Sequence, residues 1–126
     1  MHEIVDIEPP RSLNQWEREV LEQLLSARFA GRAELLGQLG SVRVIGECQD
    51  GCRSVQLAVA GVTAPAVTAE RVPVEGQALD EDGVPLLFLL HVVDGFLHEL
   101  EILRADSRTV RRLPPPDSIA LSAEPG

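Results

Sequence analysis

The most reactive side chains in the sequence are two nearby cysteines. Cys48 and Cys52 flank Gln49-Asp50-Gly51, a short turn in which Gly51 can adopt a positive φ. Their side chains can therefore meet across a tight hairpin. Three interpretations stay open: two free, partly buried thiols, which is the simplest for a cytoplasmic protein, a cross-strand disulfide, or half of a zinc site.

Two histidines could complete such a zinc site. His91 and His98 fall on facing strands of a predicted hairpin, and with Cys48 and Cys52 they would make a Cys2His2 ligand set. The C-x3-C and H-x6-H spacings are not those of familiar zinc sites. We therefore expect hydrogen-bonded imidazoles, with no metal or other cofactor. A small metal-binding protein or enzyme that uses these two pairs is the alternative.

The acidic residues offer no stronger catalytic site. Asp80-Glu81-Asp82-Gly83 is dense in carboxylates but lacks the further ligands of a calcium loop, so a solvated turn is expected. Glu99 and Glu101 could approach glycosidase geometry, yet no aromatic sugar platform accompanies them. The sequence has no G-x-S-x-G, Walker A or dinucleotide motif. We assign no catalytic residue, and an enzyme is the less favoured interpretation.

The net charge favours a protein partner over nucleic acid or a membrane. The 126-residue chain carries a formal charge of −9, with one Trp, three Phe and no Tyr. Duplex binding needs clustered basic residues, single-strand binding needs exposed aromatic rings, and anionic membranes repel an acidic surface. Basic protein surfaces are attracted instead, and a homodimer is the other assembly considered. Solubility alone is the simplest reason for the acidity.

The composition is that of an ordinary globular domain. Hydrophobic residues make up 44% of the chain and charged residues 25%, which supports one core at this length. All 11 basic residues are arginine, a bias typical of GC-rich bacterial genomes. No signal peptide is visible, and no apolar run approaches the ~20 residues that span a bilayer. We expect a cytoplasmic bacterial protein.

Two helices are predicted early in the chain. Residues 1–11 are interpreted as an extended lead-in that ends at Pro9-Pro10. Asn14 can cap the first helix while Glu17 reaches back, and apolar residues follow at helical spacing until residues 28–30. A second helix is predicted over residues 32–39. Helices this short need a sheet to pack against.

An antiparallel sheet of about five strands is predicted after the helices. Alternating residues indicate strands over 42–48, 55–59 and 72–79, with a loop over 61–69. The last two strands form a long hairpin over 84–105, because Asp94-Gly95 favours a type I′ turn. The fold is therefore predicted to be α+β. Residues 1–113 form a single domain, and residues 114–126 form a Pro-rich tail.

The hairpin turn predicts which side chains share a face. A two-residue loop places His91 opposite His98, Leu90 opposite Glu99 and Phe88 opposite Glu101. One face would then lie beneath the helices and carry Leu87, Leu89, His91, Val93, Phe96, His98, Leu100 and Ile102. The other face combines apolar and acidic side chains. Its predicted partner-binding residues are Phe88, Leu90, Glu99 and Glu101.

Two segments carry a resemblance to a known group of domains. They are residues 11–25, RSLNQWEREVLEQLL, and residues 91–102, HVVDGFLHELEI, which contain a hairpin of the form Asp-Gly-aromatic-Leu-x-x-Leu-Glu after an N-terminal helix. The segments resemble small uncharacterised bacterial domains, some of them similar to immunity proteins found beside polymorphic toxins. The resemblance implies a non-catalytic, inhibitor-like or immunity-like protein. A cone-shaped sheet of the nuclear-transport-factor type is the rival fold.

Overall fold

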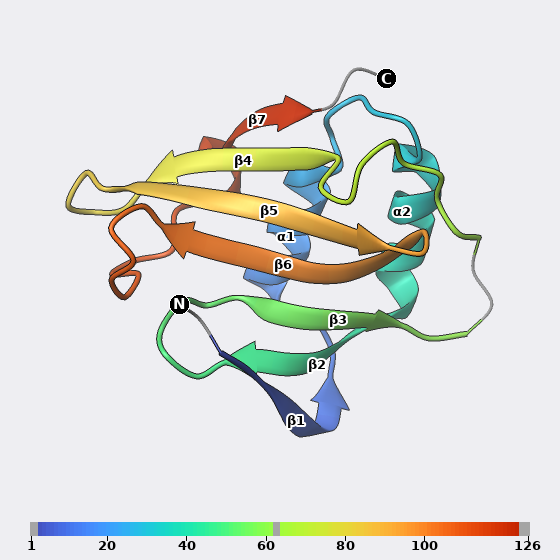
Figure 1. Ribbon diagram of the computed structural model, residues 1–126, viewed down its shortest axis with the longest axis horizontal. Helices are drawn as coiled ribbons and strands as arrows, with labels where there is room; N and C mark the ends of the chain where they lie inside the picture. The colour runs from blue at the N-terminus through green and yellow to red at the C-terminus, as the bar shows by residue number, and fades with distance from the viewer. Residues whose placement is uncertain (1–2, 62–63, 124–126) are drawn as a thin grey trace.

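The computed structural model describes residues 3–61 and 64–123, and it shows an antiparallel sheet with both helices behind it (Figure 1). Its strands are β1 (Ile4–Arg11), β2 (Val42–Cys48), β3 (Val55–Val59), β4 (Val74–Leu79), β5 (Pro85–Val93), β6 (Phe96–Arg104) and β7 (Ala120–Ala123), and its helices are α1 (Gln15–Leu24) and α2 (Arg32–Gln38). The strand order is β1-β2-β3-β6-β5-β4-β7. The α+β class and the antiparallel sheet are confirmed.

The sheet has seven strands rather than about five, because the segments before α1 and after β6 each add an edge strand. β1 pairs with β2, and its pairing is interrupted between Asp6 and Arg11, where Pro9 and Pro10 fall. Proline lacks an N–H and is tolerated at an irregularity in an edge strand. The extended lead-in predicted over residues 1–11 is therefore, from Ile4 onward, a paired edge strand. Since β1 precedes both helices, the helix pair does not open the chain.

The segment predicted as a tail packs against the domain. β7 pairs with β4, and Ile119 is buried. Trp16 Nε1 donates a hydrogen bond to the Pro114 carbonyl at 2.8 Å, and Gln23 Nε2 donates to the Ile119 carbonyl at 3.1 Å. Gly76 on β4 makes room for this segment, because a Cβ there would overlap Ile119 Cγ2. Residues 124–126 of the predicted tail lie outside the described residues.

The first helix begins as predicted and ends earlier. Asn14 Oδ1 accepts from the Glu17 N–H at 2.8 Å, and Glu17 Oε1 accepts from the Asn14 N–H at 2.9 Å, so the capping box is confirmed. The Ser26 hydroxyl donates to the Gln23 carbonyl at 2.6 Å, and the chain turns there instead of continuing to residues 28–30. Among the residues described, neither helix has the length and apolar character to cross a membrane.

The β5–β6 hairpin turns where predicted but has a different register. Asp94 and Gly95 adopt φ values of 54° and 87°, as a type I′ turn requires. Val92 pairs with Leu97, but His91 then pairs with Glu99, so His98 is an extra residue in a β-bulge. His91 therefore does not oppose His98.

The bulge and the packing of the helices reverse the predicted faces of β5. The core side carries Leu86, Phe88, Leu90, Val92, Leu97, Leu100 and Ile102, all buried. Leu87, Leu89, His91 and Val93 are only partly buried and lie on the opposite side. The prediction that these four lie beneath the helices was wrong, although Leu100 and Ile102 were placed correctly. Because β5 is apolar on both sides, its periodicity could not choose between them.

Candidate functional site

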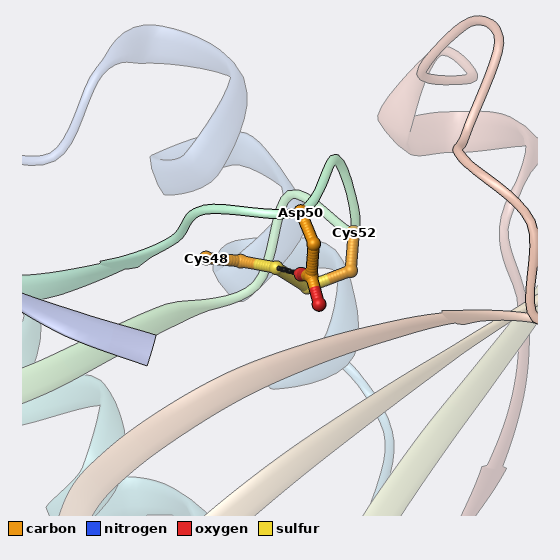
Figure 2. Close-up of side chains that lie close together, drawn as sticks. All are labelled: Cys48, Asp50 and Cys52. Atoms are coloured by element: carbon orange, nitrogen blue, oxygen red, sulfur yellow. Dashed lines mark hydrogen bonds between the residues drawn. A yellow bond between two sulfur atoms is a disulfide. The ribbon is translucent and has the colours of Figure 1, made fainter. Parts of the chain in front are cut away.

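The two cysteines form a disulfide at the loop that connects β2 to β3. The Cys48 and Cys52 sulfurs are joined, and their Cα atoms lie 6.0 Å apart (Figure 2). Of the three interpretations that the sequence left open, the disulfide is the one observed, and the simplest of them, free thiols, is not. Asp50 Oδ1 lies 2.6 Å from Cys48 Sγ. A disulfide sulfur carries no hydrogen, so this is a close contact in the oxidised chain, whereas a thiol here would donate to the carboxylate.

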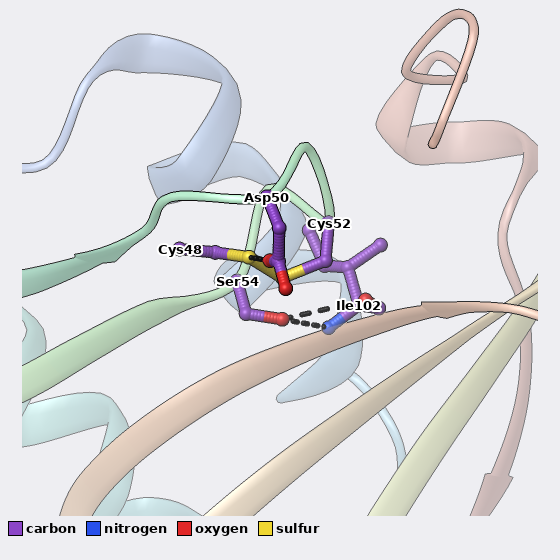
Figure 3. Close-up of a disulfide and its surroundings, with 5 residues drawn as sticks. All are labelled: Cys48, Asp50, Cys52, Ser54 and Ile102. Carbon is purple, nitrogen blue, oxygen red and sulfur yellow. Dashed lines mark hydrogen bonds between the residues drawn. A yellow bond between two sulfur atoms is a disulfide. The ribbon is translucent and has the colours of Figure 1, made fainter. Parts of the chain in front are cut away.

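A buried serine connects this hairpin to the next strand. Ser54 Oγ accepts from the Ile102 N–H at 2.8 Å and donates to the Ile102 carbonyl at 3.3 Å (Figure 3). The β3–β6 ladder itself has two pairs, Val55–Leu100 and Gln56–Glu99. The Ser54 side chain therefore extends the contact between the two strands beyond their backbone ladder.

A histidine and two glutamates gather on the sheet face opposite the helices. His91 Nε2 lies 2.7 Å from Glu101 Oε1, and Arg71 Nε donates to His91 Nδ1 at 3.0 Å. One ligand atom from each of His91, Glu99 and Glu101 lies within 4.8 Å of the others. The group thus has the residue types and proximity of a metal site.

The hydrogen bonds of His91 argue against metal ligation in this arrangement. Because Nδ1 accepts from Arg71, the proton of a neutral imidazole must lie on Nε2, where it points to Glu101. A ligating histidine needs that nitrogen free and normally donates from its other nitrogen. The alternative Cys2His2 centre also does not form, since Cys48 and Cys52 are bonded to each other.

Leucines surround this polar group on the same face. In cross-strand rows, Leu89 pairs with Glu75 and Glu101, while Leu87 pairs with Gln77 and Leu103. We call the partly buried residues Leu87, Leu89, His91, Glu99, Glu101 and Leu103 the open-face patch. Figure 1 shows both helices on the other side of the sheet.

The predicted partner-binding residues are divided between the two faces. Phe88 and Leu90 are each 0% exposed and pack in the core, so the expectation that they lie on a surface was wrong. Glu99 and Glu101 do lie on the open face, and their role in binding stays a prediction. Leu87 and Leu89 take the surface positions, because the strand alternates and the helices cover the even-numbered residues.

A second charged cluster lies at the other end of the hairpin. Arg104 is 7% exposed, and its guanidinium contacts Asp80, Asp82 and Asp106 at 2.6–3.0 Å. Asp80 also accepts from the N–H groups of Arg111 and Arg112. Asp80 is buried, so the prediction of a fully solvated turn over residues 80–83 was wrong for this residue. Arg104 occupies a core-facing position of β6, after Leu100 and Ile102. A charged residue where the alternation predicts an apolar one was the signal in the sequence for this cluster.

The hydrogen bonds of this cluster hold its carboxyls in the ionised form. Burial alone would raise the pKa of Asp80, but hydrogen bonds from the Arg111 N–H and from Arg104 outweigh burial and hold it well below its usual range. Arg104 likewise lowers the pKa of Asp82. The Arg104 guanidinium, followed by the Arg108 N–H, lowers the pKa of Asp106 to about 2. The charged groups of this cluster therefore hydrogen-bond to one another and to backbone N–H groups, and their role is to stabilise the fold.

The fold and these sites define a small α+β domain in which a twisted antiparallel sheet keeps one face clear of helices. The chain belongs to the family of domains of unknown function DUF6984, which matches residues 10–114. The match includes both helices, the β5–β6 hairpin and the Arg104 cluster, and it ends before β7. Searches of curated proteins and of solved structures found no match.

Proposed function

We propose that this protein is a non-catalytic interaction domain of the inhibitor or immunity kind, which binds a basic segment of a partner protein through the open-face patch. The observation that carries the proposal is the sheet face opposite α1 and α2. It combines partly exposed leucines of β5 and β6 with the β6 carboxylates Glu99 and Glu101.

Apolar and acidic side chains in the patch supply complementary contributions. Leu87, Leu89 and Leu103 offer area whose burial can drive association, at roughly 25 cal/mol per Å² of apolar surface. Glu99 and Glu101 lie beside them and can orient arginine or lysine side chains, which mainly improves specificity and association rate. Such a mixture suits a partner segment in which basic and apolar residues alternate.

The charge of the chain argues for a different protein rather than a second copy. A two-fold symmetric dimer brings the same patch of each subunit together. The carboxylates of Glu99 and Glu101 from both copies would then lie within one interface, and like charges there are unfavourable. The net charge of −9 adds to this repulsion and attracts a basic partner.

The proposal can be tested by capture with matched variants. Immobilised wild-type chain, a Glu99→Gln/Glu101→Gln variant and a Glu19→Gln/Glu22→Gln control would be exposed to the same lysate at physiological salt. Both variants lose two charges, but the control residues are exposed on α1. We expect a basic protein, identified by mass spectrometry, to bind the wild type and the control and to be lost from the patch variant.

Two results would contradict the proposal. Equal capture by all three proteins would show that the open-face patch is not the binding surface. Sedimentation that shows a wild-type dimer, dissociated by Glu99→Gln/Glu101→Gln, would assign the patch to a second copy. Circular dichroism of each variant verifies that a loss of binding is not a loss of folding.

A further inference from the structure

We propose that Cys48 and Cys52 form a reversible thiol–disulfide site that is reduced by a dithiol. This proposal does not rest on the binding role of the open-face patch, although Glu101 and Leu103 of that patch line the cavity beside Cys52. It rests on the hydrogen bonds that close the hairpin without the disulfide, on the access to the sulfurs, and on the carboxylate beside one of them.

The hairpin does not depend on the disulfide for closure. The Cys48 N–H donates to the Ser54 carbonyl at 3.0 Å, and the Val110 N–H donates to the Gly51 carbonyl at 3.3 Å. The Ser54 hydroxyl holds the following segment to Ile102. Disulfides that close very short loops also restrict the unfolded chain least. Breaking this bond should therefore leave the surrounding fold in place.

A reagent can reach the bond from solvent. Both cysteines are only partly buried. Cys52 lines a surface cavity of about 310 Å³ whose wall also includes Arg104 and Arg108. Accessible disulfides are the class that undergoes exchange, whereas buried ones resist reduction.

The reduced state has a ready hydrogen-bond partner. Asp50 Oδ1 lies 2.6 Å from Cys48 Sγ, and Figure 3 shows the carboxylate directed at that sulfur. A Cys48 thiol would donate to Asp50, and the negative carboxylate would oppose formation of a thiolate there. Cys52 would then be the more reactive thiol of the reduced pair.

The exchange follows the usual two-step course. A thiolate of the dithiol attacks one sulfur of the disulfide, the bond to the other cysteine breaks, and the released sulfur takes the bonding electrons and a proton. The second thiol of the reagent loses its proton and attacks the mixed disulfide, which releases the remaining cysteine. The dithiol leaves as a disulfide, and that cysteine takes a proton. Two electrons and two protons are thereby transferred to the protein.

Native-state reduction tests the proposal. The folded chain would be incubated with dithiothreitol without denaturant, quenched with acid, and treated with iodoacetamide after removal of the dithiol. We expect intact mass to show two alkylated cysteines, while circular dichroism remains that of the folded chain. Oxidised glutathione should restore the bond. Reduction that occurs only in urea, or that coincides with unfolding, would overturn the proposal.

Two sets of variants make the test specific. Cys48→Ser/Cys52→Ser should fold, and failure to fold would show that the bond is structural and overturn reversibility. In the reduced protein, Asp50→Asn should speed alkylation of Cys48 about tenfold, because the neighbouring negative charge is removed. Asp117→Asn, at an exposed residue outside the hairpin, is the matched control. An unchanged rate in Asp50→Asn would contradict the assigned role of Asp50.

Discussion

The two faces of the β5–β6 hairpin use similar residues for different purposes. On the covered face, Phe88 and Leu90 are fully buried, and the buried Arg104 is held by three aspartates. On the open face, Leu89 and His91 are neighbours along β5, and Glu101 lies partly exposed beside them on β6. The first arrangement stabilises the fold. The second leaves apolar and ionisable groups partly exposed to solvent.

The difference shows that burial and hydrogen-bond partners, rather than residue type, separate charges that stabilise the fold from charges that stay partly exposed. Asp80 accepts two backbone N–H groups and a guanidinium inside the protein, which leaves little capacity for a ligand. Glu101 contacts His91 and keeps 17% of its side chain exposed to solvent. Substitutions on the covered face should therefore mainly lower stability, and substitutions on the open face should mainly lower binding.

The largest expected effect is a loss of stability on the covered face. Phe88→Ala should lower the free energy of unfolding by about 3–5 kcal/mol, because it leaves a cavity in the core. Leu89→Ala, one residue away on the open face, should cost about 1 kcal/mol or less. Urea denaturation of both variants gives the comparison. Equal losses would contradict the assignment of the faces.

Removing the buried carboxylate of the Arg104 cluster should have the next largest effect. Asp80→Asn leaves a buried guanidinium with one fewer negative partner, and breaking a buried ion pair is strongly destabilising. The melting temperature should fall by roughly 10 °C in a domain of this size. Glu81→Gln, at the exposed neighbour, should leave it within a few degrees. Calorimetry would refute the account if Asp80→Asn melted like the wild type.

Acid should weaken the same cluster. The pKa values of Asp80, Asp82 and Asp106 are lower in the folded chain than in the unfolded chain. The unfolded chain therefore binds more protons as the pH falls. The stabilisation from these pKa shifts is complete above the ordinary aspartate pKa, and it is lost as the pH falls toward the folded-state pKa of Asp106, about 2. Urea midpoints between pH 7 and pH 2 should show this loss, with a smaller one in Asp106→Asn. A wild-type midpoint that is unchanged by acid would contradict the assigned shifts.

The smallest stability effect is expected within the open-face patch. His91→Gln removes a partly exposed pair with Glu101, and such pairs contribute about 0–1 kcal/mol. The melting temperature should change by only a few degrees. A loss as large as that of Asp80→Asn would show that His91 supports the fold instead of the binding face.

Features set by local sequence were predictable. The Asn14–Glu17 capping box and the Asp94-Gly95 turn depend on a few adjacent residues, and both form as predicted. The bulge at His98 depends on how two strands pair over their length. Nothing in a strand that is apolar on both sides signals where such an extra residue falls.

Features set by distant contacts were missed. β1 and β7 are edge strands whose pairing depends on β2 and β4, and prolines near both obscured their periodicity. The Arg104 cluster joins residues more than twenty positions apart. The disulfide was geometrically foreseeable from the turn between Cys48 and Cys52, but the expectation of a cytoplasmic location favoured free thiols.

The claim that the open-face patch is the binding surface can be tested most directly by NMR titration of the ¹⁵N-labelled chain with an arginine-rich peptide. We predict the largest amide shifts at Leu89, Glu101 and their neighbours on β5 and β6, and much smaller shifts around the acidic surface of α1. Largest shifts around Glu19 and Glu22, or shifts of equal size over all acidic segments, would contradict the account.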